Sequence, residues 1–317
     1  MVDAADTVKG ASISVVIPVF NNSASLRTLF EQLSVFEAGL AERHLKLDLI
    51  FVDDGSSDDS YAILIDHKAQ RPATKLIKFT RNFGAVRAVR AGLKHASGDA
   101  LSLMAADLQD SLEKLTEMVD HWQAGAKFII CVRSQRRDPI ISRAFAVLYY
   151  GMLKRLILRN YPQGGFDLML VDKTMLRYLL RGGPLVMPQL TAFWLGFQPT
   201  IIYGERPPRP HGKSTFTFAK RLKFFVDTVT TFSVVPIRFF SAVGLITALM
   251  SLAYGSYIFV NATLGNFAVQ GFATLVVLIS FFSGLILMML GIIGEYLWRI
   301  VSALDDRPES VVEESRL

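Results

Sequence analysis

The chain has 317 residues, of which 51% are hydrophobic, and it carries a formal net charge of +6. Its one cysteine, Cys131, excludes an intrachain disulfide and a cluster of thiolate metal ligands. The apolar excess is uneven, because no Asp, Glu, Lys, Arg or His occurs in the 56 positions between Arg238 and Glu295. This distribution predicts a soluble domain followed by a membrane part.

Short apolar runs and helical patterns alternate through the first half of the chain. The start, MVDAADTVKGAS, is polar and lacks the apolar core of a signal peptide, so we expect this half to stay on the cytoplasmic side. Strands are predicted at 13–19, 47–52, 76–79 and 100–105, and helices at 23–40, 56–68 and 85–95. Continuous apolar strands between helices indicate an α/β fold with a mostly parallel sheet covered on both faces.

Polar residues follow the predicted strands, where ligands of such sheets bind. Asp53 and Asp54 end a strand and can accept hydrogen bonds from a ribose or a base, although a plain helix cap would look similar. The run LSLMAADLQD, residues 101–110, ends in Asp107, Gln109 and Asp110. It is a metal site, half of one, or an ordinary strand end.

Two basic blocks, 133–159 and 204–224, concentrate the positive charge. Such blocks favour anionic partners, and beside a membrane segment lipid headgroups or phosphorylated substrates are better candidates than nucleic acid. The uncharged runs Phe239–Val260 and Ala268–Gly294 are each long enough to cross a bilayer. Cations before the first run and after the second predict a hairpin with both ends in the cytoplasm, a buried helix pair being the alternative.

The segments SVVIPVFNN, VDDGSSDDS and FTRNFGAVRAVRAGLKHASGDALSLMAADLQD together resemble the inverting nucleotide-sugar glycosyltransferases of family 2. They are most similar to the branch that loads a sugar onto a polyprenyl phosphate, which includes dolichyl-phosphate mannose synthase, GtrB-type glucosyltransferases and ArnC. Later segments, GGFDLMLVDK, RPPRPHGKST and GIIGEYLWRI, extend the resemblance over nearly the whole chain in the same order.

The resemblance implies four parts. A cytoplasmic GT-A catalytic domain takes residues 1–212, and an amphipathic helix at the membrane interface takes 213–235. Two transmembrane helices, about 239–260 and 268–294, lie within 236–298, and a cytoplasmic tail takes 299–317. The implied nucleotide-binding residues are Pro18, Phe20, Asn22, Asp53, Asp54, Arg81, Asn82 and Gly84.

The implied metal ligands are Asp107 and Gln109, which would bind Mg²⁺ or Mn²⁺ bridging the donor's diphosphate. The sequence departs from the family's Asp-x-Asp-x-Gln pattern, because the first Asp is replaced by Ala105. Mg²⁺ commonly takes one or two protein carboxylates plus substrate phosphates. We therefore expect a metal site that the substrate completes.

A phosphate acceptor needs no general base, because its second pKa is about 6 and it is mostly ionised at neutral pH. The enzyme must instead hold two anions together, which favours Arg and Lys. The acceptor phosphate is assigned to Arg206, Arg209, Lys213 and Arg137, with a headgroup-binding surface as the alternative. Catalytic roles fall to Asp107, to Asp167 near the transferred sugar, and to Arg133 at the donor diphosphate or the acceptor.

The expected reaction moves a sugar, with UDP as the expected carrier, onto undecaprenyl phosphate at the cytoplasmic face of the inner membrane. Inversion at the anomeric carbon would yield a lipid-linked sugar for modification of lipopolysaccharide or another cell-envelope glycan. Similar proteins are tetramers, so a homo-oligomer is implied. The alternatives are a processive polysaccharide synthase, whose Gln-x-x-Arg-Trp signature is missing here, and a membrane-tethered scaffold that binds nucleotide sugar without turnover, which Ala105 motivates.

Overall fold

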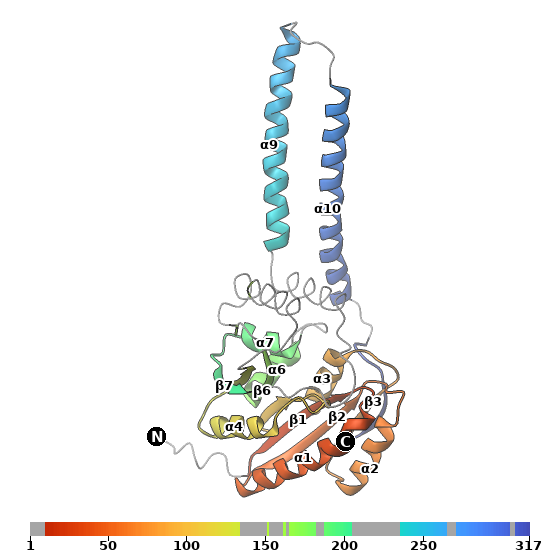
Figure 1. The fold of residues 1–317 in the computed structure, drawn as a ribbon, viewed down its shortest axis with the longest axis vertical. Helices are drawn as coiled ribbons and strands as arrows, with labels where there is room; N and C mark the ends of the chain where they lie inside the picture. Colours follow the sequence, from red (N-terminus) through yellow and green to blue (C-terminus); the bar gives the residue numbers. More distant parts are fainter. Residues whose placement is uncertain are drawn as a thin grey trace. The chain divides into compact units, whose positions relative to one another are not determined.

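The structure, a computed structural model, describes residues 10–133, 151, 161–162, 165–181, 187–204, 235–264, 271–304 and 308–317. The chain divides into two compact units (Figure 1). The first unit joins Met1–Phe218 to Arg307–Leu317, and the second is Ala219–Asp306. The residues after the apolar segment therefore return to the unit from which the chain departed.

A sheet in the order β7-β5-β6-β4-β1-β2-β3-β8 forms the centre of the first unit. Neighbouring strands pair in parallel except that β6 is antiparallel to β4 and β5, and β8 is antiparallel to β3. The predicted α/β fold with a mostly parallel sheet is confirmed. The strands are β1 (Ser12–Val19), β2 (Lys46–Asp53), β3 (Lys75–Phe79), β4 (Ala100–Leu103), β5 (Phe128–Arg133), β6 (Phe166–Asp172), β7 (Thr200–Gly204) and β8 (Val312–Arg316).

Helices cover both faces of this sheet (Figure 1). On one face α1, α2 and α4 pack against the strands, and on the other α3 packs on β1 and β2 beside α6, which contacts α7. Gly92 of α3 allows close contact, because an added Cβ would lie 2.3 Å from Cγ1 of Val16. These helices are α1 (Ser23–Glu42), α2 (Ser60–Gln70), α3 (Ala85–Lys94), α4 (Leu112–Gln123), α6 (Lys173–Arg181) and α7 (Pro188–Trp194).

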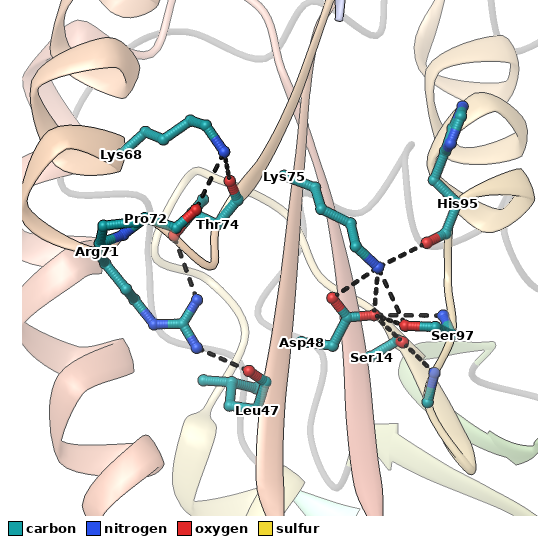
Figure 2. A network of polar contacts seen from close by, with 11 residues as sticks. Ser14, Leu47, Asp48, Lys68, Arg71, Pro72, Thr74, Lys75, His95 and Ser97 are labelled. Carbon is teal, nitrogen blue, oxygen red and sulfur yellow. Dashed lines mark hydrogen bonds and ion pairs between the residues drawn. The ribbon is translucent and has the colours of Figure 1, made fainter. Parts of the chain in front are cut away.

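A polar network ties the strands together at their amino ends (Figure 2). Asp48 of β2 accepts hydrogen bonds from the Ser14 hydroxyl (2.7 Å) and from Ser97 Oγ (3.0 Å), and it pairs with Lys75 Nζ (3.0 Å). Lys75 Nζ also donates to the His95 carbonyl (2.9 Å). Burial alone would raise the pKa of Asp48, but these hydrogen bonds and the nearby ammonium outweigh it and leave the pKa lowered.

The second unit holds two long helices, α9 (Val235–Thr263) and α10 (Phe272–Leu304). They contact each other where Gly244 lies against Met289, and many of their large apolar side chains are exposed, including Leu245, Met250 and Leu287. Within the described residues, one stretch, Phe281–Trp298, is long and apolar enough to cross a membrane. The predicted interfacial helix at 213–235 falls almost wholly outside the described residues.

Candidate functional site

The carboxyl ends of β1 and β2 lie side by side, since Val19 and Asp53 are register partners. The two loops that follow are bound to each other. The Asn21 backbone N–H donates to Ser56 Oγ (3.0 Å), and the Ser57 backbone N–H donates to Oδ1 of Asn21 (2.9 Å). These hydrogen bonds hold the two loops, and the side chains that follow β1 and β2, in place at this edge of the sheet.

Asp53 is fully buried at this edge, and its two carboxylate oxygens differ. Oδ2 accepts a hydrogen bond from the Ser56 backbone N–H (3.1 Å). Oδ1 is buried and has no hydrogen-bond partner within the described residues. Burial raises the pKa of Asp53, and the hydrogen bonds from Ser56 offset the increase only in part. A buried acceptor without a partner is costly, which makes Oδ1 a candidate contact for a ligand that donates a hydrogen bond.

Asp54, the next residue, is buried too but is fully engaged with the protein. Its oxygens accept the backbone N–H groups of Phe83 (2.7 Å) and Gly84 (2.9 Å), which precede α3. Burial raises its pKa despite these bonds. Gly55 lets the two loops approach, because its φ is +69° and an added Cβ would lie 2.4 Å from the Arg81 carbonyl carbon. Asp54 thus holds the loop 81–84 in place.

The other predicted nucleotide-binding residues lie around the same edge. Pro18 is half-buried and Phe20 is 40% exposed. Asn22 uses its side-chain oxygen locally, accepting the Phe20 backbone N–H (3.0 Å). Arg81 and Asn82 are exposed, and the Arg81 guanidinium lies 4.2 Å from the centre of the Phe83 ring. Phe20 and Arg81 thus expose side chains on the loops that follow β1 and β3.

The loop after β4 carries the predicted metal ligands. Oδ1 of Asp107 accepts the Gln109 backbone N–H (3.2 Å), and Leu108 between them has a positive φ of 60°. Asp110, 8% exposed, accepts the Ala105 backbone N–H through Oδ2 (2.6 Å). No group of three or more His, Cys, Asp or Glu side chains that could hold a metal occurs in the described part of the chain. The described residues of this loop therefore do not form a complete metal site by themselves.

Two further predicted residues come to the same edge through their strands. Arg133 is the last residue of β5, and Asp167 is the second residue of β6, whose amino end lies at this edge because β6 is antiparallel. The register shifts between Cys131, which pairs with Leu168, and Val132, which pairs with Phe166, so Asp167 lies at a β-bulge. Bulges are common beside active sites. Leu103 pairs with Met169, which places the backbone of Asp167 near the start of the loop 105–110.

The predicted acceptor residues Arg137, Arg206, Arg209 and Lys213 lie outside the described residues. Their role stays a prediction. Sequence reasoning assigned Asp110 no role of its own, and the structure shows that its side chain binds the Ala105 backbone N–H within the same loop. It also gave Asp53 and Asp54 the same role, although the structure separates them. A carboxylate that binds backbone N–H groups thirty residues away leaves no local signal in the sequence.

Comparison with known proteins gives the family. Residues 14–179, more than half of the chain, match glycosyl transferase family 2. YkcC, an uncharacterized glycosyltransferase of Bacillus subtilis (strain 168), is 31% identical over 306 residues, covering 95% of this chain and 93% of the relative. A prophage-derived bactoprenol glucosyl transferase of Shigella flexneri is 30% identical over 310 residues, covering 96% and 98%.

Among solved structures, glucosyl-3-phosphoglycerate synthase from Mycobacterium tuberculosis, in complex with Mn²⁺, UDP and glucosyl-3-phosphoglycerate, has the same fold. It superposes with a TM-score of 0.50 at 14% identity, covering 73% of this chain and 83% of that one. The family match covers residues 14–179, which include most of β1, strands β2 to β6 of the sheet and the loops at its carboxyl edge. The chain belongs to glycosyl transferase family 2 and is a glycosyltransferase.

Proposed function

We propose that the protein transfers a sugar from a nucleotide-sugar donor, with UDP as the nucleotide, to a polyprenyl phosphate at the cytoplasmic face of the membrane. The observation that carries the proposal is the similarity to the bactoprenol glucosyl transferase, which covers 96% of this chain and so takes in both units. A relative that shared only the sheet would support the donor and say nothing of a lipid acceptor.

The donor's nucleoside is assigned to Asp53. Its Oδ1, which has no hydrogen-bond partner among the described residues, would accept a hydrogen bond from the base or the ribose. Such a bond removes the cost of a buried acceptor left without a donor. Phe20, which is 40% exposed, offers an apolar face to the base. Asp54 is assigned an indirect role. It fixes the backbone of Phe83 and Gly84 and does not bind the nucleotide itself.

The oxygen ligands of the loop after β4 fit a divalent cation that is shared with the donor. Asp107 and Gln109 would hold Mg²⁺ or Mn²⁺, which prefer such ligands and commonly bind through substrate phosphates as well. Bound there, the ion would neutralise charge on the leaving diphosphate. Asp110 would support this site indirectly, since its bond to the Ala105 backbone N–H shapes the loop.

The acceptor brings its own nucleophile. A phosphate oxygen attacks the anomeric carbon as the bond from that carbon to the nucleotide diphosphate breaks, so the configuration inverts and the electron pair leaves with the diphosphate. Asp167 is assigned to the transferred sugar and Arg133 to the phosphates, because their strands place their backbones at the edge where the loop 105–110 begins. Arg137, Arg206, Arg209 and Lys213 are proposed to bind the lipid phosphate.

The path of the chain supports a proposal of two membrane crossings. The first unit contains residues on both sides of Ala219–Asp306, so the segment between them crosses an even number of times if it crosses at all. Helix α9, Val235–Thr263, would reach about 44 Å at 1.5 Å per residue, which exceeds the roughly 30 Å core of a bilayer. We propose that α9 and α10 form a transmembrane hairpin, which also explains their exposed apolar side chains.

The test is transfer by the purified full chain in detergent. Radiolabelled UDP-sugars are offered with undecaprenyl phosphate, and the product is extracted into organic solvent and its anomeric configuration determined. The proposal expects label in the lipid phase that depends on both substrates and on a divalent cation. Label that appears in polymer would instead support a processive synthase.

Ala105 favours one alternative, a scaffold that binds nucleotide sugar without turnover, because the family pattern has a second carboxylate at this position. Binding of UDP-sugar in calorimetry with no transfer to any lipid phosphate would favour the scaffold over the enzyme.

A further inference from the structure

The residues that follow the second unit, Ala219–Asp306, belong to the first unit. Strand β8, Val312–Arg316, pairs antiparallel with β3, and the Thr80 backbone N–H donates to the Val311 carbonyl (3.1 Å). The strand therefore extends the sheet on the side of β2, whose last residue is Asp53. A segment far away in sequence thus lies close to the donor residues.

Three acids of this segment each contact a different element. Glu309 pairs with Arg90 of α3, Glu313 pairs with Lys78 of β3 (2.8 Å), and Glu314 accepts the Tyr61 hydroxyl of α2 (2.7 Å). The pair between Glu313 and Lys78 is partly exposed, with 50% and 26% of the two side chains accessible. Exposed pairs contribute little to stability. The contact through Glu309 differs, because its partner Arg90 is buried.

Arg90 is a buried cation, with only 4% of its side chain exposed. Both oxygens of Glu309 accept from its guanidinium, with Nε to Oε2 at 3.1 Å and Nη2 to Oε1 at 3.2 Å. The remaining donors reach the carbonyls of Leu179 (3.4 Å) and Leu180 (3.0 Å) in α6. Burial would raise the pKa of Glu309, but the hydrogen bond and charge of Arg90 outweigh it and lower the pKa. A two-point contact of this kind fixes orientation as well as charge.

The position of α3 determines the position of the loop 81–84, which precedes it. The helix begins directly after Gly84, whose backbone N–H binds Asp54, and Arg87 Nη1 donates back to the Phe83 carbonyl (2.9 Å). Gly92 packs α3 closely on Val16 of β1, so a shift of the helix at Arg90 would be expected to move its first turn as well. Without Glu309 the guanidinium would be a buried charge with carbonyl partners alone, and α3 would have to shift to bring it to water.

We infer that Glu309 is a positioning residue for the donor site, holding α3 and the loop 81–84 in place through its contact with buried Arg90. This inference rests on the proposed function, because it assumes that the nucleotide binds beside this loop. It gives the segment 308–317 a role in donor binding, although the segment comes after the second unit in the sequence.

The test compares two changes that remove the same charge from the same segment. Glu309→Gln leaves Arg90 without its carboxylate, and Glu313→Gln, the matched control, frees only a partly exposed lysine. In the purified full chain, we expect calorimetric affinity for UDP to fall about tenfold for Glu309→Gln, which corresponds to about 1.4 kcal/mol. The control should bind UDP as the wild type does. For Glu309→Gln the KM for the donor should rise, while the KM for polyprenyl phosphate stays unchanged.

A second variant covers the case in which Glu309→Gln does not fold. The double change Arg90→Met/Glu309→Gln removes both charges and keeps an apolar side chain in the buried position, so it should fold and recover most of the UDP affinity. A double variant that folds yet binds UDP about tenfold more weakly than the wild type would show that Glu309 does not act through Arg90, and the inference would be wrong.

Two other outcomes separate this inference from the proposed function. Wild-type chain that binds no UDP would overturn both. Wild-type chain that binds UDP, with Glu309→Gln lowering the melting temperature but leaving UDP affinity and donor KM unchanged, would overturn the inference alone, since Glu309 would then contribute only to stability.

Discussion

Two aspartates of one strand, Asp48 and Asp53, show how the two ends of the sheet differ. At the amino end Asp48 is surrounded by donors from Ser14, Lys75 and Ser97, and its pKa is lowered (Figure 2). At the carboxyl end Asp53 is more deeply buried, has one oxygen without a partner within the described residues, and has a raised pKa. A carboxylate that the protein satisfies stabilises the fold, whereas one that it leaves unsatisfied is available to a substrate.

The largest effect should come from removing the acid of the loop after β4. Asp107→Ala takes away the one carboxylate assigned to the cation, and we expect transfer to fall by roughly a hundredfold or more, since such an ion supplies several kcal/mol to the transition state. Initial rates with and without EDTA measure this effect. Ala105→Asp is the counterpart, and it should lower the Mn²⁺ concentration needed for half-maximal rate. Near-normal turnover of Asp107→Ala, together with insensitivity to EDTA, would exclude the metal site.

The proposed role of Asp53 in donor binding can be tested with Asp53→Asn. The change keeps the shape of the side chain but removes its charge and one acceptor. A hydrogen bond to a charged group contributes about 1.5–3 kcal/mol, so UDP affinity should fall about ten- to a hundredfold. The melting temperature should stay the same or rise, because the buried charge is gone. Isothermal calorimetry and thermal unfolding are the two measurements, and unchanged UDP affinity would remove Asp53 from the donor site.

The same substitution at the amino end of β2, Asp48→Asn, should lower stability and leave UDP affinity unchanged. Asp48→Asn breaks the pair with Lys75 and weakens the hydrogen bonds from Ser14 and Ser97, and we expect a loss of about 2 kcal/mol in the free energy of unfolding. The melting temperature should fall by roughly 4–8 °C for a unit of this size. UDP affinity of the folded protein should not change. If Asp48→Asn weakened UDP binding as much as Asp53→Asn, the two ends would not have separate roles.

The smallest effect is a pH dependence of opposite sign at the two aspartates. The pKa of Asp48 is lowered on folding, so its contribution is present above its ordinary value of about 3.9 and is lost as the pH falls through the lowered pKa. The pKa of Asp53 is raised, so its contribution is full below about 3.9 and is lost as the pH rises through the raised pKa.

Thermal unfolding between about pH 3 and pH 7 tests this difference. The stability gap between wild type and Asp48→Asn should narrow as the pH falls. Asp53→Asn should gain on the wild type as the pH rises. Parallel curves for both variants would contradict the assignment of the two carboxylates.

The sequence predicts the parts of this fold that depend on local pattern. The apolar runs at β1 to β4 and the helices α1 and α3 were placed within a few residues, because continuous β-branched strands and helical spacing leave a clear signal. Strand β8 left none. Its segment, VEESR, is mostly charged. It is a strand because β3 offers an edge, because Lys78 and Tyr61 bind two acids of the strand, and because Arg90 binds Glu309 just before it.

The candidate site shows the same limit. Asp53 and Asp54 were identified together from the text VDDGSSDDS, since both follow a strand. Their separation depends on which of them meets the backbone of Phe83 and Gly84, which is a matter of tertiary packing. The bulge at Asp167 depends equally on the pairing of β5 with β6, two strands that are distant in sequence.

Strand β8 also sets an order of events during synthesis. The ribosome must make the second unit, Ala219–Asp306, before it makes the strand that completes the sheet, a delay of roughly five to twenty seconds at 5–20 residues per second. Until then β3 is an open edge, and Arg90 is without Glu309. During this interval the open edge of β3 can pair with strands of other chains. Completion of the sheet therefore waits for synthesis of the whole second unit.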